Sequence, residues 1–118
     1  MKTFGSAVYG VEAITITVEA NVLGGSKYYI VGLPDNAVKE SIQRVESAVK
    51  SNGYHMPRTK LVINLAPSDI KKSGSAFDLP MAIAVLGASE QITETEKLNQ
   101  YVMMGELSNQ AAVQRTKD

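Results

Sequence analysis

Alternating apolar and polar residues predict the first strands of this chain. Between Ala13 and Val22 every second residue is apolar, which is the spacing of a strand with one buried face and one face in solvent. Residues 3–9 are a weaker strand candidate before it. After the turn-forming residues 24–27, the apolar run 28–31 is expected to return as the second strand of a hairpin.

The spacing of apolar residues becomes helical after residue 34. Apolar side chains then recur every three or four positions, on one stripe that faces a core: Val38, Ile42, Val45 and Val49. Asp35 is the predicted N-cap of this helix, because its carboxylate can accept hydrogen bonds from the unpaired amides of the first turn. Gly53 is the predicted left-handed residue that ends it.

A second strand and helix are predicted in the middle of the chain. Residues 59–65 are mostly apolar and are expected to form a strand covered on both faces. Residues 81–88 are apolar on all sides, which is typical of a buried helix. Asp78 is predicted to cap this helix, and Pro80 fits its first turn, where a missing N–H group is tolerated.

Beyond residue 90 the pattern weakens. Thr93 and Glu96 have the spacing of a capping box, which predicts a short helical turn ending near Asn99. Residues 101–107 are expected to form another buried strand. The resulting order of strands, helix, strand, helix and strand, with an antiparallel start, favours an α+β or mixed α/β domain of two layers.

Composition narrows the possible functions. The 118 residues suit one domain, and twelve basic and twelve acidic residues leave no net charge to attract nucleic acid or a membrane surface. Cysteine is absent, and His55, the single histidine, has no carboxylate cluster near it in sequence, so no metal site is expected. No apolar run approaches the ~20 residues that span a bilayer. We therefore expect a cytoplasmic protein.

Three segments resemble the N-terminal domain of the magnesium-chelatase-like family of AAA+ proteins. They are residues 29–41 (YIVGLPDNAVKES), 64–84 (NLAPSDIKKSGSAFDLPMAIA) and 104–108 (MGELS). The resemblance implies a ribosomal protein S5 domain 2-like fold, shared with the proteolytic domain of Lon, over residues 1–108. The family pattern continues beyond this point, so residues 109–118 are expected to be a partial end of the same domain, truncated at its C-terminus.

The resemblance also implies a function for the longer proteins. They contain an AAA+ ATPase module that forms rings and, in members of the competence type, drives branch migration of DNA. Residues 24–27 (GGSK) lack the pattern of a phosphate-binding P-loop, so ATP and magnesium are implied only for that other module. We expect a non-catalytic accessory domain without a cofactor, which contacts the ATPase module, neighbouring subunits or DNA. An exposed edge on strand 101–107 is expected to favour self-association.

A vestigial Ser-Lys peptidase is the least favoured alternative. The resemblance places residues 74–78 on the catalytic turn of Lon, but the position of the nucleophile falls on Ala76. Ser75 lies one position away and is expected to face elsewhere. Gly74 and Asp78 then have structural roles, in the turn and in capping the helix.

An autonomous nucleic-acid-binding module is the other alternative. Four cations, Lys71, Lys72, Arg58 and Lys60, lie close in sequence and are candidates for contacts with a partner or a DNA backbone. Solvated lysines are the simpler interpretation. The corner formed by Gly32, Pro34 and Asp35 is both a candidate docking point and a plain structural turn, with a close-passing glycine, a stiff proline and a helix cap.

Overall fold

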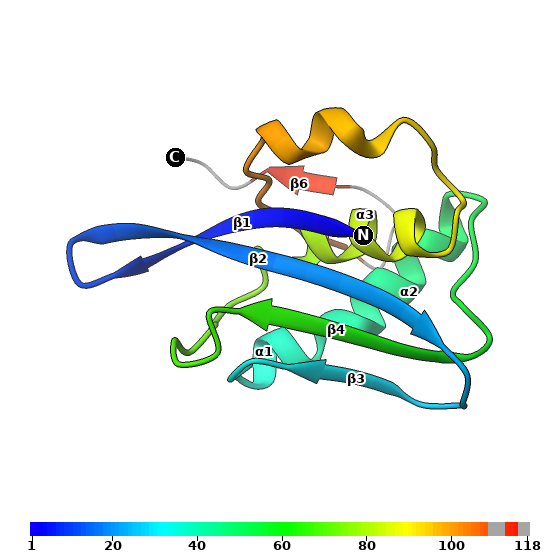
Figure 1. Ribbon diagram of the computed structural model, residues 1–118, viewed down its shortest axis with the longest axis horizontal. Helices are drawn as coiled ribbons and strands as arrows, with labels where there is room; N and C mark the ends of the chain where they lie inside the picture. Colours follow the sequence, from blue (N-terminus) through cyan, green and yellow to red (C-terminus); the bar gives the residue numbers. More distant parts are fainter. Residues whose placement is uncertain (109–112, 116–118) are drawn as a thin grey trace.

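Ten elements form the described part of the chain, residues 1–108 and 113–115 of a computed structural model (Figure 1). In chain order they are β1 Lys2–Tyr9, β2 Glu12–Leu23, β3 Tyr28–Val31, α1 Asn36–Lys39, α2 Ser41–Ser51, β4 Lys60–Ala66, α3 Asp78–Ala88, the 3-10 helix η1 Thr95–Gln100, β5 Gly105–Leu107 and β6 Val113–Arg115. The predicted tail at 109–112 and 116–118 lies outside the described residues.

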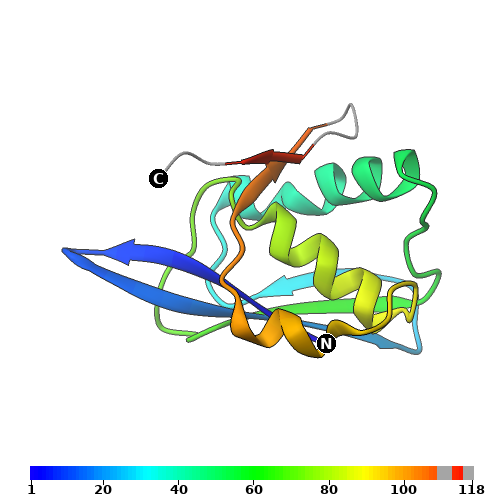
Figure 2. The same cartoon turned by 90° about the horizontal axis from the view of Figure 1, so that it is seen from above.

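A mixed four-stranded sheet with the order β1-β2-β4-β3 forms one layer. Helices α2 and α3 form the second layer and lie on the same side of the sheet (Figure 2). This confirms the predicted α+β architecture of two layers. Among the described residues, no helix is long and apolar enough to cross a membrane.

The predicted hairpin between β2 and residues 28–31 is wrong. β4 lies between the two strands, antiparallel to β2 and parallel to β3. β4 pairs along seven residues of β2, and β3 pairs along only four residues of β4. The longer strand therefore takes the central position, and β3 is left at the edge.

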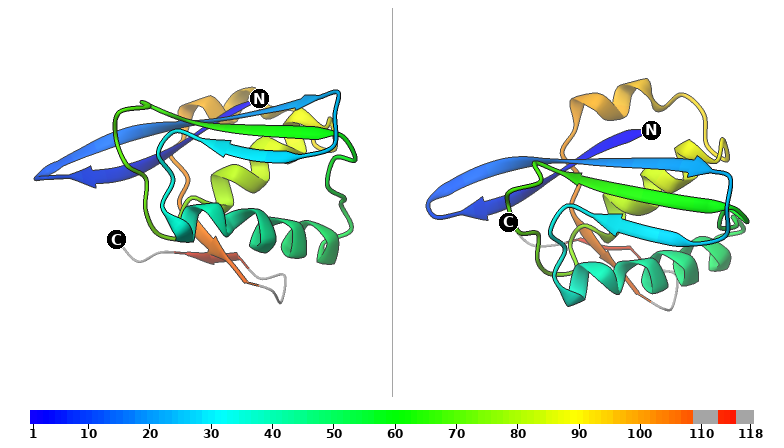
Figure 3. Two further views of the ribbon diagram at one scale, coloured as in Figure 1. Left: turned by 90° about the horizontal axis from the view of Figure 1, so that it is seen from below. Right: turned by 60° about the horizontal axis from the view of Figure 1, so that its bottom comes forward.

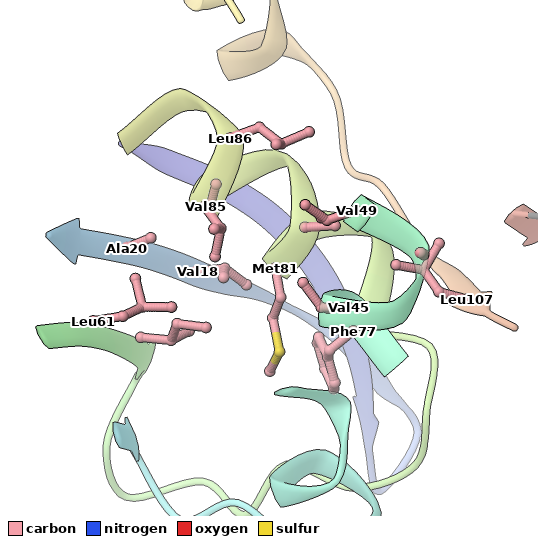
Figure 4. Close-up of a cluster of buried hydrophobic side chains, with 14 of the residues drawn as sticks. Val18, Ala20, Val45, Val49, Leu61, Phe77, Met81, Val85, Leu86 and Leu107 are labelled. Atoms are coloured by element: carbon pink, nitrogen blue, oxygen red, sulfur yellow. The ribbon is translucent and has the colours of Figure 1, made fainter. Parts of the chain in front are cut away.

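The core lies between the sheet and the two helices. The predicted alternation of β2 is confirmed, since Ile16, Val18 and Ala20 are buried. β4 is buried on one face only, through Leu61, Ile63 and Leu65, and Asn64 on the other face is exposed. The prediction that both faces are covered is therefore wrong, because no described element lies over that side of the sheet. Figure 4 shows side chains of this core, with Met81 near its middle and Phe77 beside Val45 of α2.

The helix predicted after Asp35 is confirmed, but it is broken into α1 and α2 at Glu40. Its end is a Schellman motif: the N–H of Tyr54 donates to the Val49 carbonyl (3.0 Å), and the N–H of Gly53 donates to the Lys50 carbonyl (3.2 Å). Gly53 has φ +85°, as its predicted left-handed role requires.

Two predictions for the C-terminal third are corrected. The short helical turn exists as η1, but no side chain caps it, and the residue before it is Glu94 in the left-handed region at φ 58°. Of residues 101–107 only β5 is a strand, because residues 101–104 run along β1 without forming a ladder. There the N–H of Met103 donates to the Phe4 carbonyl (2.7 Å), while Tyr101 and Val102 are exposed.

Candidate functional site

The two longest family-like segments meet at one junction, where the loop after β4 passes the corner between β3 and α1. The N–H of Lys72 donates to the Leu33 carbonyl (2.9 Å), and the N–H of Asp35 donates to the Lys72 carbonyl (2.9 Å). Pro34 and Lys72 thus form an isolated parallel bridge. We call this region, residues 32–35 with 67–74, the corner junction.

Asp35 ties the corner junction to the start of α1. Its Oδ1 accepts the N–H of Val38 (2.8 Å), which confirms the predicted N-cap. Its Oδ2 accepts the N–H of Gly74 from the other loop (3.3 Å). Gly74 has φ +85°, a backbone conformation that glycine adopts at little cost. One carboxylate therefore fixes both loops.

Lys72 is fully buried and is not a surface cation. Its Nζ donates to the carbonyl of Pro67 within the same loop. Burial lowers the pKa of Lys72, and the charge of Asp69 partly opposes this effect. The proposed role of Lys72 in contacting DNA is therefore corrected, because a phosphate cannot reach a side chain that is enclosed by protein.

Gly32 and Leu33 carry the sharpest backbone constraints of the corner. Gly32 has φ +108°, and a Cβ atom there would lie 2.0 Å from the carbonyl oxygen of Leu65. This confirms that the chain passes too closely for any side chain. Leu33 has φ 57°, which is unusual for a residue with a side chain, and 52% of it is exposed.

Asp78 binds Arg44 instead of capping α3. The residue before α3 is Phe77, which makes no side-chain cap. Arg44 donates from Nε to Asp78 Oδ2 (2.6 Å) and from Nη2 to Oδ1 (3.0 Å), and Oδ2 also accepts the N–H of Leu107 (3.2 Å). The bond with Asp78 raises the pKa of Arg44. The predicted capping role of Asp78 is therefore wrong.

Sequence reasoning missed the Arg44 side of this pair. Glu40 lies four residues before Arg44, which is the spacing of an ion pair along a helix, but that contact is long, at 3.9 Å. Arg44 Nη2 also donates to the Ala37 carbonyl (2.7 Å) and to Ser41 Oγ (3.1 Å), across the break between α1 and α2. The network therefore joins α1, α2, α3 and β5, which no local sequence pattern connects.

The remaining candidate cations do not gather at one place. Arg58 precedes β4, Lys60 is its first residue, and Lys71 follows its far end. Lys60 also stacks over Tyr29, with Nζ 5.2 Å from the centre of the ring. Contacts of Lys71, Arg58 and Lys60 with a partner stay predictions, without a shared patch to support them.

The turn at residues 74–78, where the sequence suggested a vestigial peptidase, has structural hydrogen bonds. The Ser75 carbonyl accepts the N–H of Asp78 (3.2 Å), and the Ala76 carbonyl accepts the N–H of Gly105 from β5 (2.8 Å). Ala76 has no hydroxyl, and the ammonium group of Lys72 is held by Pro67. Among the described residues, no three His, Cys, Asp or Glu side chains are grouped so that they could hold a metal ion.

Comparison with known proteins identifies the family. The sequence matches the family described as subunit ChlI of Mg-chelatase over residues 18–118. The chain therefore belongs to the Mg-chelatase ChlI family, and the matched residues include the whole corner junction.

The chain is also similar to several longer bacterial proteins. It is 48% identical over 103 residues to the uncharacterized protein YifB of Escherichia coli, a match that covers 86% of this chain and 20% of YifB. It is 38% identical over 106 residues to the competence protein ComM of Haemophilus influenzae, covering 89% of this chain and 21% of ComM. An uncharacterized protein of Mycobacterium tuberculosis is 37% identical over 108 residues, covering 91% and 21%. The chain thus spans about a fifth of these relatives.

Proposed function

We propose that this chain is the non-catalytic accessory domain of a ComM-type AAA+ protein and that it holds the ATPase module through the corner junction. In the longer protein the ATPase module hydrolyses ATP and acts on DNA, as the family resemblance implies. This chain supplies a rigid contact surface. The proposal is supported by the match to ComM and YifB over about a fifth of their length.

The observation that carries the proposal is the exposed leucine at the tip of the corner. A left-handed conformation costs a leucine on the order of 1 kcal/mol, and a side chain in water regains nothing through burial. Leu33 is nevertheless held there by Gly32, by Pro34 and by its hydrogen bond from Lys72. A surface hollow of about 250 Å³ beside it is lined by Leu33, Pro34 and Lys71. An apolar side chain in a rigid frame next to a free cation suits contact with another protein surface.

A chimera tests this proposal. The matching N-terminal fifth of ComM of Haemophilus influenzae is replaced by this chain, and transformation frequency and ATP hydrolysis are measured with and without Leu33→Asp. We expect Leu33→Asp to lower the transformation frequency of the chimera at least tenfold. A tenfold change is about the effect of losing 1.4 kcal/mol of contact energy. ATP hydrolysis should be weakened less, because the residues that bind ATP lie in the other module.

Leu23→Asp is the matched control, because Leu23 is 48% exposed and lies at the end of β2, with an ordinary backbone. It should leave transformation unchanged. Circular dichroism of the isolated chain checks that both variants fold. Equal transformation by the Leu33→Asp and unaltered chimeras would contradict the proposed contact.

A further inference from the structure

The free edge of the sheet is β3 and not β5, where the sequence led us to expect it. β5 pairs with β6 on one side, and on its other side the N–H groups of Gly105 and Leu107 donate to Ala76 and Asp78. The outer side of β1 is bridged through Met103 and Met104. β3 pairs only with β4, and no other described strand or loop pairs with it (Figure 3). β3 is therefore an open edge.

The backbone of β3 offers unpaired hydrogen-bonding groups at this edge. The Leu61 N–H donates to the Lys27 carbonyl (3.1 Å), so the alternation of a parallel ladder turns the Tyr29 and Val31 backbone toward β4. The N–H and C=O groups of Tyr28 and Ile30 then point outward. An edge of this kind can accept one more strand from another polypeptide.

A groove runs beside this edge. It has a volume of about 250 Å³ and is lined by Tyr28, Tyr29, Ile30, Lys39 and Ile42, from β3, α1 and α2. It is mostly apolar, and its one charged lining residue is Lys39. An added strand would therefore lay apolar side chains against Ile42, because alternate residues of a strand face opposite sides.

The charges around the edge favour an acidic occupant. Lys27 precedes β3, Lys60 lies over the ring of Tyr29, and Lys39 lines the groove. The nearby carboxylate on α2 has a partner of its own, because Glu46 pairs with Lys50 (3.1 Å). A second copy of this chain would bring the lysines at this edge toward one another, and this repulsion disfavours it as the occupant.

We propose that β3 is a docking edge for an extended, acidic segment of another polypeptide, which adds as a fifth strand and sets apolar side chains against Ile42. This inference goes beyond the proposed function, and it uses a different surface from the tip of the corner. Main-chain hydrogen bonds to Tyr28 and Ile30 supply affinity. The lysines around this edge favour carboxylates on the segment.

The test titrates the ¹⁵N-labelled chain with an acetylated, amidated peptide of sequence Thr-Val-Glu-Val-Glu-Thr, and amide shifts and hydrogen exchange are followed by NMR. We expect binding to slow exchange at Tyr28 and Ile30 and to leave Tyr29 and Val31 unchanged, since the latter already face β4. The same peptide with lysine in place of glutamate should bind at least about fivefold more weakly, as expected from the energies of exposed charge pairs.

A charge reversal at the groove separates the proposed site from other surfaces. Lys39→Glu should weaken the acidic peptide roughly two- to fivefold. Lys97→Glu, on the exposed surface of η1, should have no effect. Absence of binding by the acidic peptide, equal affinity for both peptides, or protection away from β3 would overturn the proposal. Concentration-dependent protection of Tyr28 and Ile30 without peptide would instead identify a second copy as the occupant, and would overturn it too.

Discussion

Lys72 and Asp78 are charged residues enclosed in the fold, and both have partners that fix distant segments. The ammonium group of Lys72 is held by the Pro67 carbonyl, while its backbone joins the corner between β3 and α1. Asp78 joins α2 to β5 through Arg44 and the N–H of Leu107. Among the described residues, no buried side-chain nitrogen or oxygen lacks a hydrogen-bond partner. Lys72 and Asp78 therefore stabilise the shape of this family-like segment, whereas Lys71 of the same segment is exposed.

The lowered pKa of Lys72 predicts a specific dependence of stability on pH. Its pKa lies below the ordinary value of 10.5, because burial penalises the charged form. Between the lowered pKa and 10.5 the unfolded chain binds more protons than the folded chain, so the free energy of unfolding rises with pH. Below the lowered pKa the penalty is present in full.

Comparison with Lys72→Met isolates this effect. The difference in the free energy of unfolding between the unaltered chain and Lys72→Met should shift in favour of the unaltered chain as pH rises from the lowered pKa of Lys72 toward 10.5. Urea unfolding followed by circular dichroism measures it, and tyrosine titration cancels because both chains contain the same tyrosines. Lys71→Met, at an exposed neighbour, should show no such trend. A flat difference for Lys72→Met would refute the pH effect.

At the scale of elements, the junction of β3, α1 and β4 depends on a single glycine. Gly32 has φ +108°, and the Leu65 carbonyl of β4 occupies the space of its missing side chain. β3 therefore turns into α1 immediately beside the strand with which it pairs. Asp35 then caps α1, so the turn, the cap and the pairing of the two strands depend on each other.

Gly32→Ala should destabilise the chain by about 3 kcal/mol, because the new Cβ adds a clash with backbone to a strained φ. Gly10→Ala is the matched control. Gly10 also has a positive φ, +65°, but nothing lies within 4 Å of its Cβ position, so about 1 kcal/mol of strain is expected. Chemical denaturation measures both variants. Equal losses of stability in the two variants would show that the close approach of Gly32 to the Leu65 carbonyl does not contribute to the cost of the substitution.

At the scale of the whole molecule, the distribution of charge argues against a role in binding DNA by itself. The net charge is zero, Lys72 is buried, and the other candidate cations are divided between the two ends of β4. Affinity for a DNA backbone depends on many phosphates being neutralised together. Among the described residues, the four candidate cations do not gather on one surface for that.

A salt titration with DNA tests this conclusion. In a gel shift with a duplex of about 30 base pairs, we expect only weak binding, with a dissociation constant of about 10⁻⁴ M or above at physiological salt, the weak end of non-specific affinity. Lys71→Glu should change it little. Tight binding that falls steeply with salt and is lost in Lys71→Glu would support the autonomous nucleic-acid-binding module instead.

The sequence by itself determined several of the elements and the family. Alternation identified β2, the helical stripe identified the helical segment that forms α1 and α2, with its cap at Asp35 and its end at Gly53, and the motif segments identified the family to which the chain belongs. These features are local, because strand periodicity, helix caps and left-handed glycines depend on residues a few positions apart.

Only the tertiary structure decided which elements are neighbours and which charges are buried. The sequence predicted β3 beside β2, Lys72 in solvent and Asp78 as a helix cap. The structure places β4 between the strands, encloses Lys72 and pairs Asp78 with Arg44, 34 residues away. Pairing and burial depend on competition among segments far apart in the chain for the same space and the same partners, and no local pattern records the result of that competition.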